Sequence, residues 1–303
     1  MAQNAQHTHS PLTPAQKWEQ ATLANNFIFY KVMRHHRSAC KTLLELLLGI
    51  KIRQLHFAQE ETVAIDGNAK SIRLDVLAED AKRMFDIELQ VADTKELSER
   101  ARYYQGVLDV DMLGKGQRYR ELKEAHIIFL CMEDIFGEGL PVYTFENTCR
   151  EKSAIKLNDR AYKHFFIAPS CATLSAEGEQ RAFFRLLTTG SATSAFTEQL
   201  KAYVDDAKHN TQWRVQYITW ERQRTYDFDA GMEKGQAIGI NIGMERGQAI
   251  GMEKGARQRA LASARQLLAM QLLTPEQIAQ AVQLPLEQVI ALQGTTRSEG
   301  YSI

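Results

Sequence analysis

The sequence predicts an α/β domain built on a mixed β-sheet, followed by a helical C-terminal extension. Two segments, 72–79 and 85–90, alternate apolar and polar residues on either side of a short polar turn, as paired strands with two distinct faces do. The continuous apolar run 126–132 has the length of a strand that is covered on both faces. From residue 176 onwards apolar residues recur at helical spacing, so the extension is predicted to be helical.

The elements before this hairpin follow from periodicity and cap signals. Residues 14–33 have a helical pattern, and residues 38–48 form a second predicted helix with Gly49 as its C-terminal cap. Residues 50–65 have the pattern of a first strand, and the triplet at 66–68, Asp-Gly-Asn, is a strong turn signal. A helix and one strand are therefore expected immediately before the hairpin.

The elements after the hairpin complete the sheet. Asp93 and Glu96 have the spacing of a capping box, and the helix that they predict ends near Met112. Its apolar stripe consists of Leu97, Ala101, Tyr104 and Leu108. Because this helix precedes the run 126–132, we expect a crossover connection between strands. Residues 142–145 are predicted to form a further short strand, and residues 158–166 fit either a helix or a strand.

Carboxylates and an amide occupy the polar positions of the hairpin. Asp75 lies on the first strand, and Asp86, Glu88 and Gln90 follow one another on one face of the second. Two carboxylates on adjacent strands can share a hard divalent cation such as Mg²⁺, which prefers oxygen ligands. The same pattern also fits the solvated face of an antiparallel sheet, so the residue pattern alone leaves both interpretations open.

Five segments carry a family resemblance. They are NNFIFYKVM, LLELLLGIKI, RLDVLAED, FDIELQVADTKELSERARYYQGVLDVDML and FGEGLPVYTFEN. Through them, residues 22 to about 165 resemble the Rpn family of recombination-promoting nucleases and transposases, which belongs to the PD-(D/E)xK nuclease superfamily. The resemblance covers about half of the chain and implies a restriction-endonuclease-like αβββαβ core with a mixed sheet.

The resemblance also implies roles for individual residues. Asp75 corresponds to the strand aspartate and Glu88 to the second carboxylate, both binding Mg²⁺ or another divalent cation. Gln90 stands where the motif has its lysine; glutamine cannot act as a general base, but it can orient a water molecule. A first-helix acid contributes to the metal site in this superfamily, so Glu45 is a third candidate ligand. The alternative for Glu45 is a side chain that emerges at the edge of its helix.

Several basic residues are candidate contacts to a phosphate backbone. Arg100 and Arg102 lie off the apolar stripe of their helix, and the planar guanidinium binds phosphate well. A solvated helix face is the alternative. Arg160, Lys163 and His164 are weaker candidates, for which core aromatics with polar edges are the alternative.

Composition restricts the partners and the compartment. The formal net charge is zero, so the whole-chain balance does not indicate a strongly basic DNA-binding protein, although it allows a local basic groove. The four cysteines are scattered, which is typical of reduced side chains in a cytoplasmic protein. The chain has no apolar run of about 18 residues, so no membrane partner is expected.

Five segments are expected along the chain. They are a disordered tail (1–16), the nuclease-like domain (17–170), a helical packing region (171–229), a glycine repeat (230–255) and a small tail that resembles a helix-turn-helix (256–303). Each glycine of the repeat costs a helix interior about 1 kcal/mol relative to alanine. The repeat is therefore expected to be a marginal helix or a linker ordered by self-association. The tail lacks basic residues on its second helix, which favours protein binding or dimerisation over DNA reading.

These observations lead to three functional hypotheses. The first is a Mg²⁺-dependent DNA endonuclease of low sequence specificity, linked to recombination or mobile-element activity. The second is a catalytically weak nuclease-fold module that binds DNA or protein and assembles as a homo-oligomer through its helical tail. The third is a toxin-like or antiphage nuclease that its own tail holds inactive, which truncation near residue 230 would test.

Overall fold

The computed structural model describes residues 12–57, 76–92, 95–174 and 176–298. The chain divides into two compact units, residues 1–222 and 223–303. The first unit contains the β-sheet, and the second is helical in its described part.

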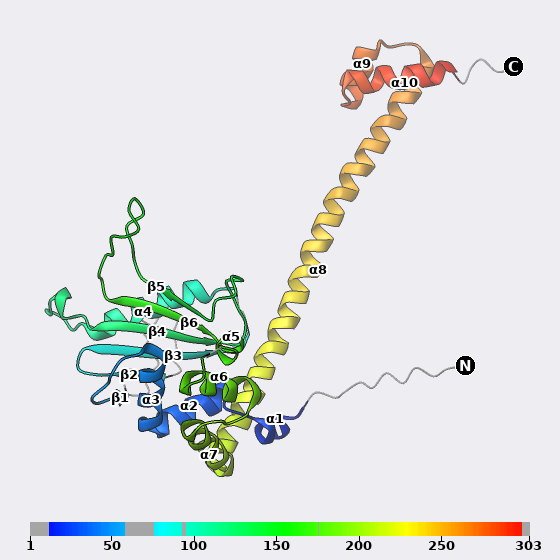
Figure 1. Cartoon of the computed structure of the whole chain (residues 1–303). Coiled ribbons are helices and arrows are strands. Elements are labelled where there is room, and N and C mark those ends of the chain that lie inside the picture. Colours follow the sequence, from blue (N-terminus) through cyan, green and yellow to red (C-terminus); the bar gives the residue numbers. More distant parts are fainter. Residues whose placement is uncertain (1–11, 58–75, 93–94, 175, 299–303) are drawn as a thin grey trace, which may run out of the picture. The chain divides into compact units, whose positions relative to one another are not determined.

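A six-stranded mixed sheet forms the centre of the first unit (Figure 1). Its strands are β1 (His56–Phe57), β2 (Val76–Glu79), β3 (Arg83–Gln90), β4 (Glu124–Cys131), β5 (Val142–Phe145) and β6 (Ala161–Ile167). The spatial order is β1-β2-β3-β4-β6-β5, with β3, β4 and β6 parallel and the other pairs antiparallel. The α/β class, the hairpin and the αβββαβ element order are confirmed.

The helical N-terminal segment differs from the single helix predicted over 14–33. It forms two helices, α1 (Pro14–Gln20) and α2 (Asn26–His35), because Asn25 caps a new helix by accepting the backbone N–H groups of Phe27 and Ile28. Helix α3 (Arg37–Leu48) agrees with the prediction. Gly49 ends it in the left-handed region at φ 65°, where glycine carries no Cβ penalty.

The structure can be compared with the predictions for the first strand, for the start of α4 and for residues 158–166. The described part of the first strand is limited to β1, and residues 58–65 and the turn at 66–68 lie outside the described residues. Helix α4 (Leu97–Met112) ends as predicted, but its N-cap residue is Glu96, which makes no side-chain cap hydrogen bond; Asp93 lies outside the described residues. Residues 158–166, for which the pattern was ambiguous, contribute to strand β6.

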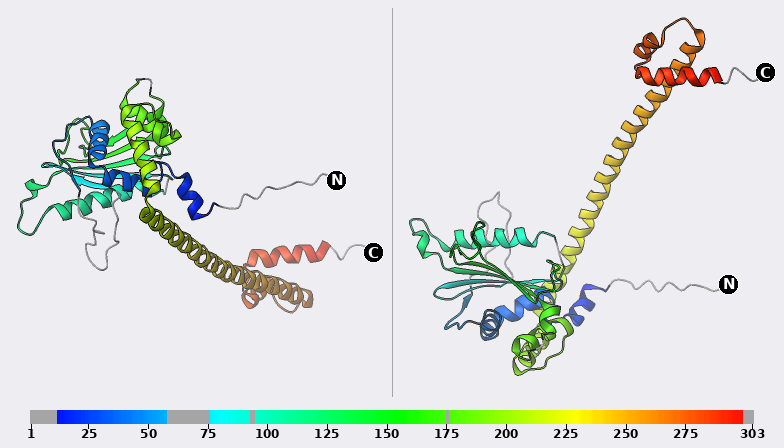
Figure 2. Two further views of the ribbon diagram at one scale, coloured as in Figure 1. Left: turned by 90° about the horizontal axis from the view of Figure 1, so that it is seen from below. Right: turned by 45° about the horizontal axis from the view of Figure 1, so that its top comes forward.

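Helices cover both faces of the sheet (Figure 2). Helix α4 covers one face, where Leu97, Ala101 and Leu108 pack on Phe129 and Ile127. The other face is covered by α2, α3, α5 (Ala168–Ala172) and α6 (Glu179–Thr189), and α7 (Ala195–His209) packs on α2 and α6. Because β4 lies between β3 and β6 and has helices on both sides, its sequence is continuously apolar from Ile127 to Cys131.

The region after the sheet belongs to the same core. Tyr217, near the start of helix α8 (Thr211–Met270), is 2% exposed and lies 5.2 Å from the ring of Trp18 and 5.5 Å from that of Phe27. Lys17 forms an ion pair with the buried carboxylate of Glu221. These contacts join α1, α2 and the first turns of α8.

The second unit contains the rest of α8 and two short helices, α9 (Pro275–Val282) and α10 (Leu286–Ser298). Thr274 caps α9 and Pro275 occupies its first turn, as predicted. A small core forms from Ala264, Ile278, Ala279 and Val289. Among the described residues, no helix combines the length and the apolar character that crossing a membrane requires.

Candidate active site

The polar face of β3 is buried. Asp86, Glu88 and Gln90 are 0%, 3% and 8% exposed, so the interpretation of this face as a solvated surface is wrong. The face is buried because β3 pairs with β2 on one side and β4 on the other, while α4 covers it. Burying a carboxylate costs free energy unless it is paired or binds a cation. The buried carboxylates of β3 therefore require a positive charge or hydrogen-bond donors nearby.

Arg100 of α4 supplies part of that compensation. Its Nη2 lies 3.3 Å from Oε2 of Glu88, and its Nη1 donates a hydrogen bond of 2.8 Å to Oε1 of Gln90. The centre of the guanidinium lies 5.4 Å from the ring centroid of Tyr104 and 5.9 Å from that of Phe129. Arg100 therefore points into the site, although its position off the apolar stripe indicated an outward contact to phosphate.

Tyr104 fixes the arginine on its other side. Its hydroxyl accepts hydrogen bonds from Nη2 of Arg100 at 3.0 Å and from Nε at 3.3 Å. Burial raises the pKa of Tyr104, the negative charge of Glu88 raises it further, and the hydrogen bond from Arg100 opposes both effects. The phenol is thus neutral at physiological pH, and it holds the guanidinium against the strand.

The amide of Gln90 is held at both ends. Its Oε1 accepts from Arg100, and its Nε2 donates to the backbone carbonyl of Ala92. A fixed amide can still orient a solvent molecule, because its NH₂ group has two donors. Arg100 places a positive charge next to Gln90, the position at which the motif carries its lysine.

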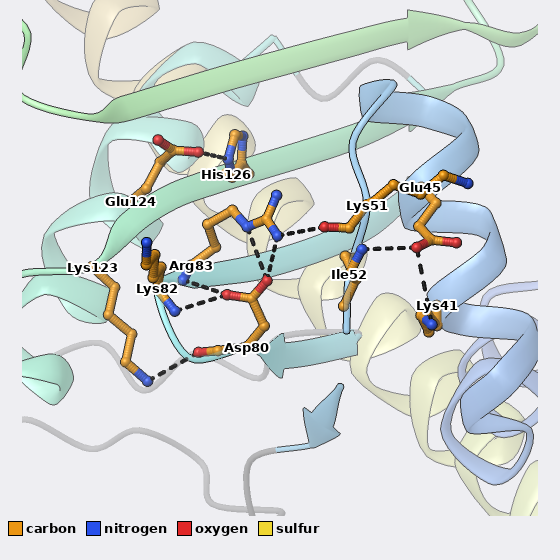
Figure 3. Close-up of polar contacts among 10 residues, drawn as sticks. All are labelled: Lys41, Glu45, Lys51, Ile52, Asp80, Lys82, Arg83, Lys123, Glu124 and His126. Atoms are coloured by element: carbon orange, nitrogen blue, oxygen red, sulfur yellow. Dashed lines mark hydrogen bonds and ion pairs between the residues drawn. The ribbon is translucent and has the colours of Figure 1, made fainter. Parts of the chain in front are cut away.

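Asp75 and Glu45 are the other two candidate metal ligands. Asp75 lies outside the described residues; in the chain it directly precedes Val76, whose Cα partner on β3 is Ile87. Oε1 of Glu45 accepts the backbone N–H of Ile52 at 2.7 Å and lies 4.0 Å from Nζ of Lys41 (Figure 3). The structure therefore gives Glu45 a role in holding the loop after α3 and does not bring it to Glu88.

The remaining basic candidates lie in three environments. Arg102 is exposed on α4, and Arg160 is exposed just before β6. His164 is buried, and its Nε2 lies 3.0 Å from Nδ1 of His126, so its prediction as a nucleic-acid contact is wrong. Lys163, beside it on β6, is half-buried.

The donor set fits a hard divalent cation in chemical type. Hard cations prefer oxygen ligands. On the buried polar face of β3, side-chain oxygens come from the carboxylates of Asp86 and Glu88 and from the amide of Gln90. In the part of the chain that the structure describes, no cluster of three or more acidic, histidine or cysteine side chains could hold a metal ion. Asp75, the other candidate carboxylate, lies outside the described residues.

The mixed sheet and the group of Glu88, Gln90 and Arg100 belong to one α/β domain. Residues 33–164 match the family model described as PD-(D/E)XK nuclease family transposase, which confirms the resemblance seen in the sequence. The match supports a nuclease-type hydrolase that acts on DNA, and PD-(D/E)XK nucleases generally use divalent cations. Comparisons with curated proteins and with solved structures gave no match.

Sequence reasoning missed the inward orientation of Arg100 and its contact with Tyr104. A signal was present, because the two residues are four positions apart on one helix and Tyr104 belongs to the buried stripe. A long side chain one turn before a buried tyrosine can reach over it towards the sheet.

Proposed function

We propose that the α/β domain is a DNA endonuclease that depends on Mg²⁺ or another divalent cation and has low sequence specificity. Asp75 and Glu88 would hold the cation. When bound, such a cation polarises the scissile phosphate and lowers the pKa of a bound water molecule. The proposal extends to a role in recombination or mobile-element activity, in line with the transposase description of the matching family.

The convergence of Glu88, Gln90 and Arg100 on one buried strand face carries this proposal. Gln90 orients the attacking water through its amide. Arg100 holds Gln90 in place and offers a positive charge to the phosphate. In the PD-(D/E)xK motif, the lysine has this role. A guanidinium fixed by Tyr104 needs little reorganisation when charge develops on the phosphate.

The low sequence specificity has its own support. Arg100 faces the protein interior and contacts three side chains there, so it is not placed to read base edges. Contacts to phosphate position DNA without reading its sequence.

Cleavage of a supercoiled plasmid by the full chain tests the proposal. Nicking in Mg²⁺ should disappear in EDTA, in Asp75→Ala and in Glu88→Gln, whereas the exposed control Arg185→Ala should keep most of the activity. Equal nicking by all variants would show that the activity does not come from this site.

A second copy of the chain is the further partner that we propose, through α8. Glycines recur at every fourth position from Gly231 to Gly255, and those from Gly231 to Gly251 are exposed. Exposed apolar side chains lie one position before or after these glycines: Met232, Ile238, Ile240, Ile242, Met244, Ile250 and Met252. The opposite positions carry glutamate, alanine and asparagine. Gly239, Gly243 and Gly251 have apolar neighbours on both sides, whereas Gly235 and Gly247 lie between charged and polar side chains. A glycine groove with apolar walls at these three positions allows close approach of a second helix.

The period of this repeat also predicts the geometry of pairing. A four-residue step advances about 40° beyond one turn of 3.6 residues, so the glycines drift around a straight helix. Repeats longer than 3.6 residues per turn favour right-handed supercoiling. The alternative function, a catalytically weak nuclease-fold module that assembles through its helices, draws its support from this surface.

A further inference from the structure

An open groove of about 900 Å³ lies at the amino ends of the parallel strands β3, β4 and β6, away from Glu88. Its walls come from the loop after α3, the β2–β3 turn, the start of β4 and the residue before β6. Arg83, at the start of β3, points to the α3 side and packs over Phe85 at 5.8 Å. Glu88 is five positions further along β3 and faces α4, whereas Arg83 faces the α3 side, so Glu88 lies away from the groove.

The groove is basic, although the chain as a whole has no net charge. Among the described residues, six cationic side chains line it against three acidic ones: Lys51, Arg53, Lys82, Arg83, Lys123 and Arg160 against Glu79, Asp80 and Glu124. The three acids are already engaged, Asp80 by Arg83, Glu79 by Lys123 and Glu124 by His126. The excess positive charge of the groove is therefore available to an anion.

Three of the cations have no acidic partner among the described residues. They are Lys51, Arg53 and Lys82, and each is exposed. Arg160 is also exposed, and its Nη2 donates to the backbone carbonyl of Arg120 at 3.3 Å. These cations stand apart on different chain segments, so together they suit several anionic groups better than one.

The framework beneath the cations is rigid (Figure 3). Oδ1 of Asp80 accepts the backbone N–H groups of Lys82 and Arg83, both at 2.8 Å, and Oδ2 accepts Nη2 of Arg83 at 2.6 Å. Nη2 of Arg83 also donates to the backbone carbonyl of Lys51 at 2.8 Å. Burial raises the pKa of Asp80, but the hydrogen bonds from Arg83 and from the backbone outweigh it and lower the pKa below its usual value. Asp80 thus stays ionised and locks the turn to the loop.

The backbone before β6 is held as firmly. Arg160 has φ 60°, an uncommon conformation for a residue other than glycine. The N–H of Ala125 donates to its carbonyl at 2.9 Å, which fixes the strained residue beside the start of β4. Residues held in such conformations are concentrated at binding sites.

We propose that this groove binds the phosphodiester backbone of a nucleic acid, at a site separate from Glu88; the proposal rests on the nuclease function proposed above. A compact phosphate site would need converging backbone N–H groups, but Asp80 takes those of Lys82 and Arg83. The described part of the lining contains no phenylalanine, tyrosine or tryptophan on which a base could stack. The groove therefore contacts phosphates along a strand and does not read sequence.

Binding in EDTA separates this proposal from cleavage. Fluorescence anisotropy of a labelled DNA duplex, with the full chain and increasing salt, would compare wild type with the triple variant Lys51→Gln, Arg53→Gln, Lys82→Gln. The matched control removes three exposed cations elsewhere: Lys152→Gln, Arg185→Gln and Lys201→Gln. Circular dichroism verifies that both variants are folded.

The groove variant should bind at least about tenfold more weakly than the control, and the slope of log K against log salt should fall by about 0.9 for each lost phosphate contact. Equal affinity and slope in the two variants would overturn the proposal. So would loss of inorganic tripolyphosphate binding with unchanged duplex binding, because the groove would then be a small-anion site. If the plasmid is not cleaved but the groove variant alone loses DNA, the groove stands and the nuclease proposal fails.

Discussion

The guanidinium of Arg100 lies 3.3 Å from the carboxylate of Glu88, and the two side chains come from helix α4 and strand β3. Glu88 is almost fully buried, and the side chain of Arg100 is 27% exposed. The ion pair therefore links helix α4, which covers this face of the sheet, to the candidate active site on β3. Truncation of the arginine would leave a buried carboxylate with less compensation.

Arg100→Ala is expected to lower the free energy of unfolding by about 1–3 kcal/mol, because a buried hydrogen-bonded charge loses its partner. It should also slow cleavage, because the positive charge that we propose for the phosphate is lost. Urea unfolding and plasmid cleavage measure the two effects. Arg102→Ala, two positions along the same helix, should stay within about 0.5 kcal/mol of wild type. Equal destabilisation by both variants would contradict the pairing.

Glu88→Gln and Glu45→Gln are expected to have different effects. A lost metal ligand costs several kcal/mol of transition-state stabilisation, so Glu88→Gln should reduce cleavage roughly a thousandfold. Glu45 binds the N–H of Ile52, and its amide variant should keep cleavage within a few-fold while lowering stability. Mg²⁺ titration by calorimetry supplies a readout independent of activity. Loss of Mg²⁺ binding in Glu45→Gln would restore Glu45 as a ligand.

The buried pair of His126 and His164 predicts loss of stability in acid. Burial lowers the pKa of His164 to about 4, and His126 adds to that effect; burial also lowers the pKa of His126. Between about pH 6.5 and 4 the unfolded chain therefore binds more protons than the folded one, and stability falls as the pH falls through this window. The penalty from His164 is roughly 3 kcal/mol at most.

Thermal or urea unfolding from pH 7.5 to pH 4 tests this prediction. His164→Gln should flatten the decline, and the exposed control His209→Gln should leave it unchanged. The partners of the pair are Glu124, 2.9 Å from Nε2 of His126, and Thr144, 3.2 Å from Nδ1 of His164. An identical pH dependence in wild type and His164→Gln would exclude the pair as its source.

If two copies of the chain associate through the glycine groove of α8, substitutions at the glycines should weaken the dimer, and substitutions on the opposite side of the helix should not. Gly239→Leu with Gly243→Leu should increase the dissociation constant of a dimer at least tenfold, because the added side chains prevent close approach. Ala249→Leu, on the opposite positions, is the control and should associate as wild type does. Sedimentation over a range of concentrations measures this. A monomer at every concentration in wild type would exclude self-association through α8.

The sequence by itself determined the class of fold and most of its elements. Period-two alternation predicted the β2–β3 hairpin, and the apolar run predicted β4, because side-chain periodicity reports how many faces of a strand are covered. Motif spacing placed Glu88 and Gln90 on one face of β3. Local signals were weaker where tertiary contacts compete, as in the break between α1 and α2.

Tertiary structure decided what surrounds those side chains. Only the packing of α4 on β3 shows that the polar face is buried and that Arg100 turns inward onto Glu88, since helix periodicity alone does not reveal where a long side chain at the stripe edge will point. The basic groove likewise combines Lys51, Lys82 and Arg160, which are far apart in the sequence. Parallel strands bring their amino ends to one edge of the sheet, so charges from separate segments meet there although the chain as a whole is neutral.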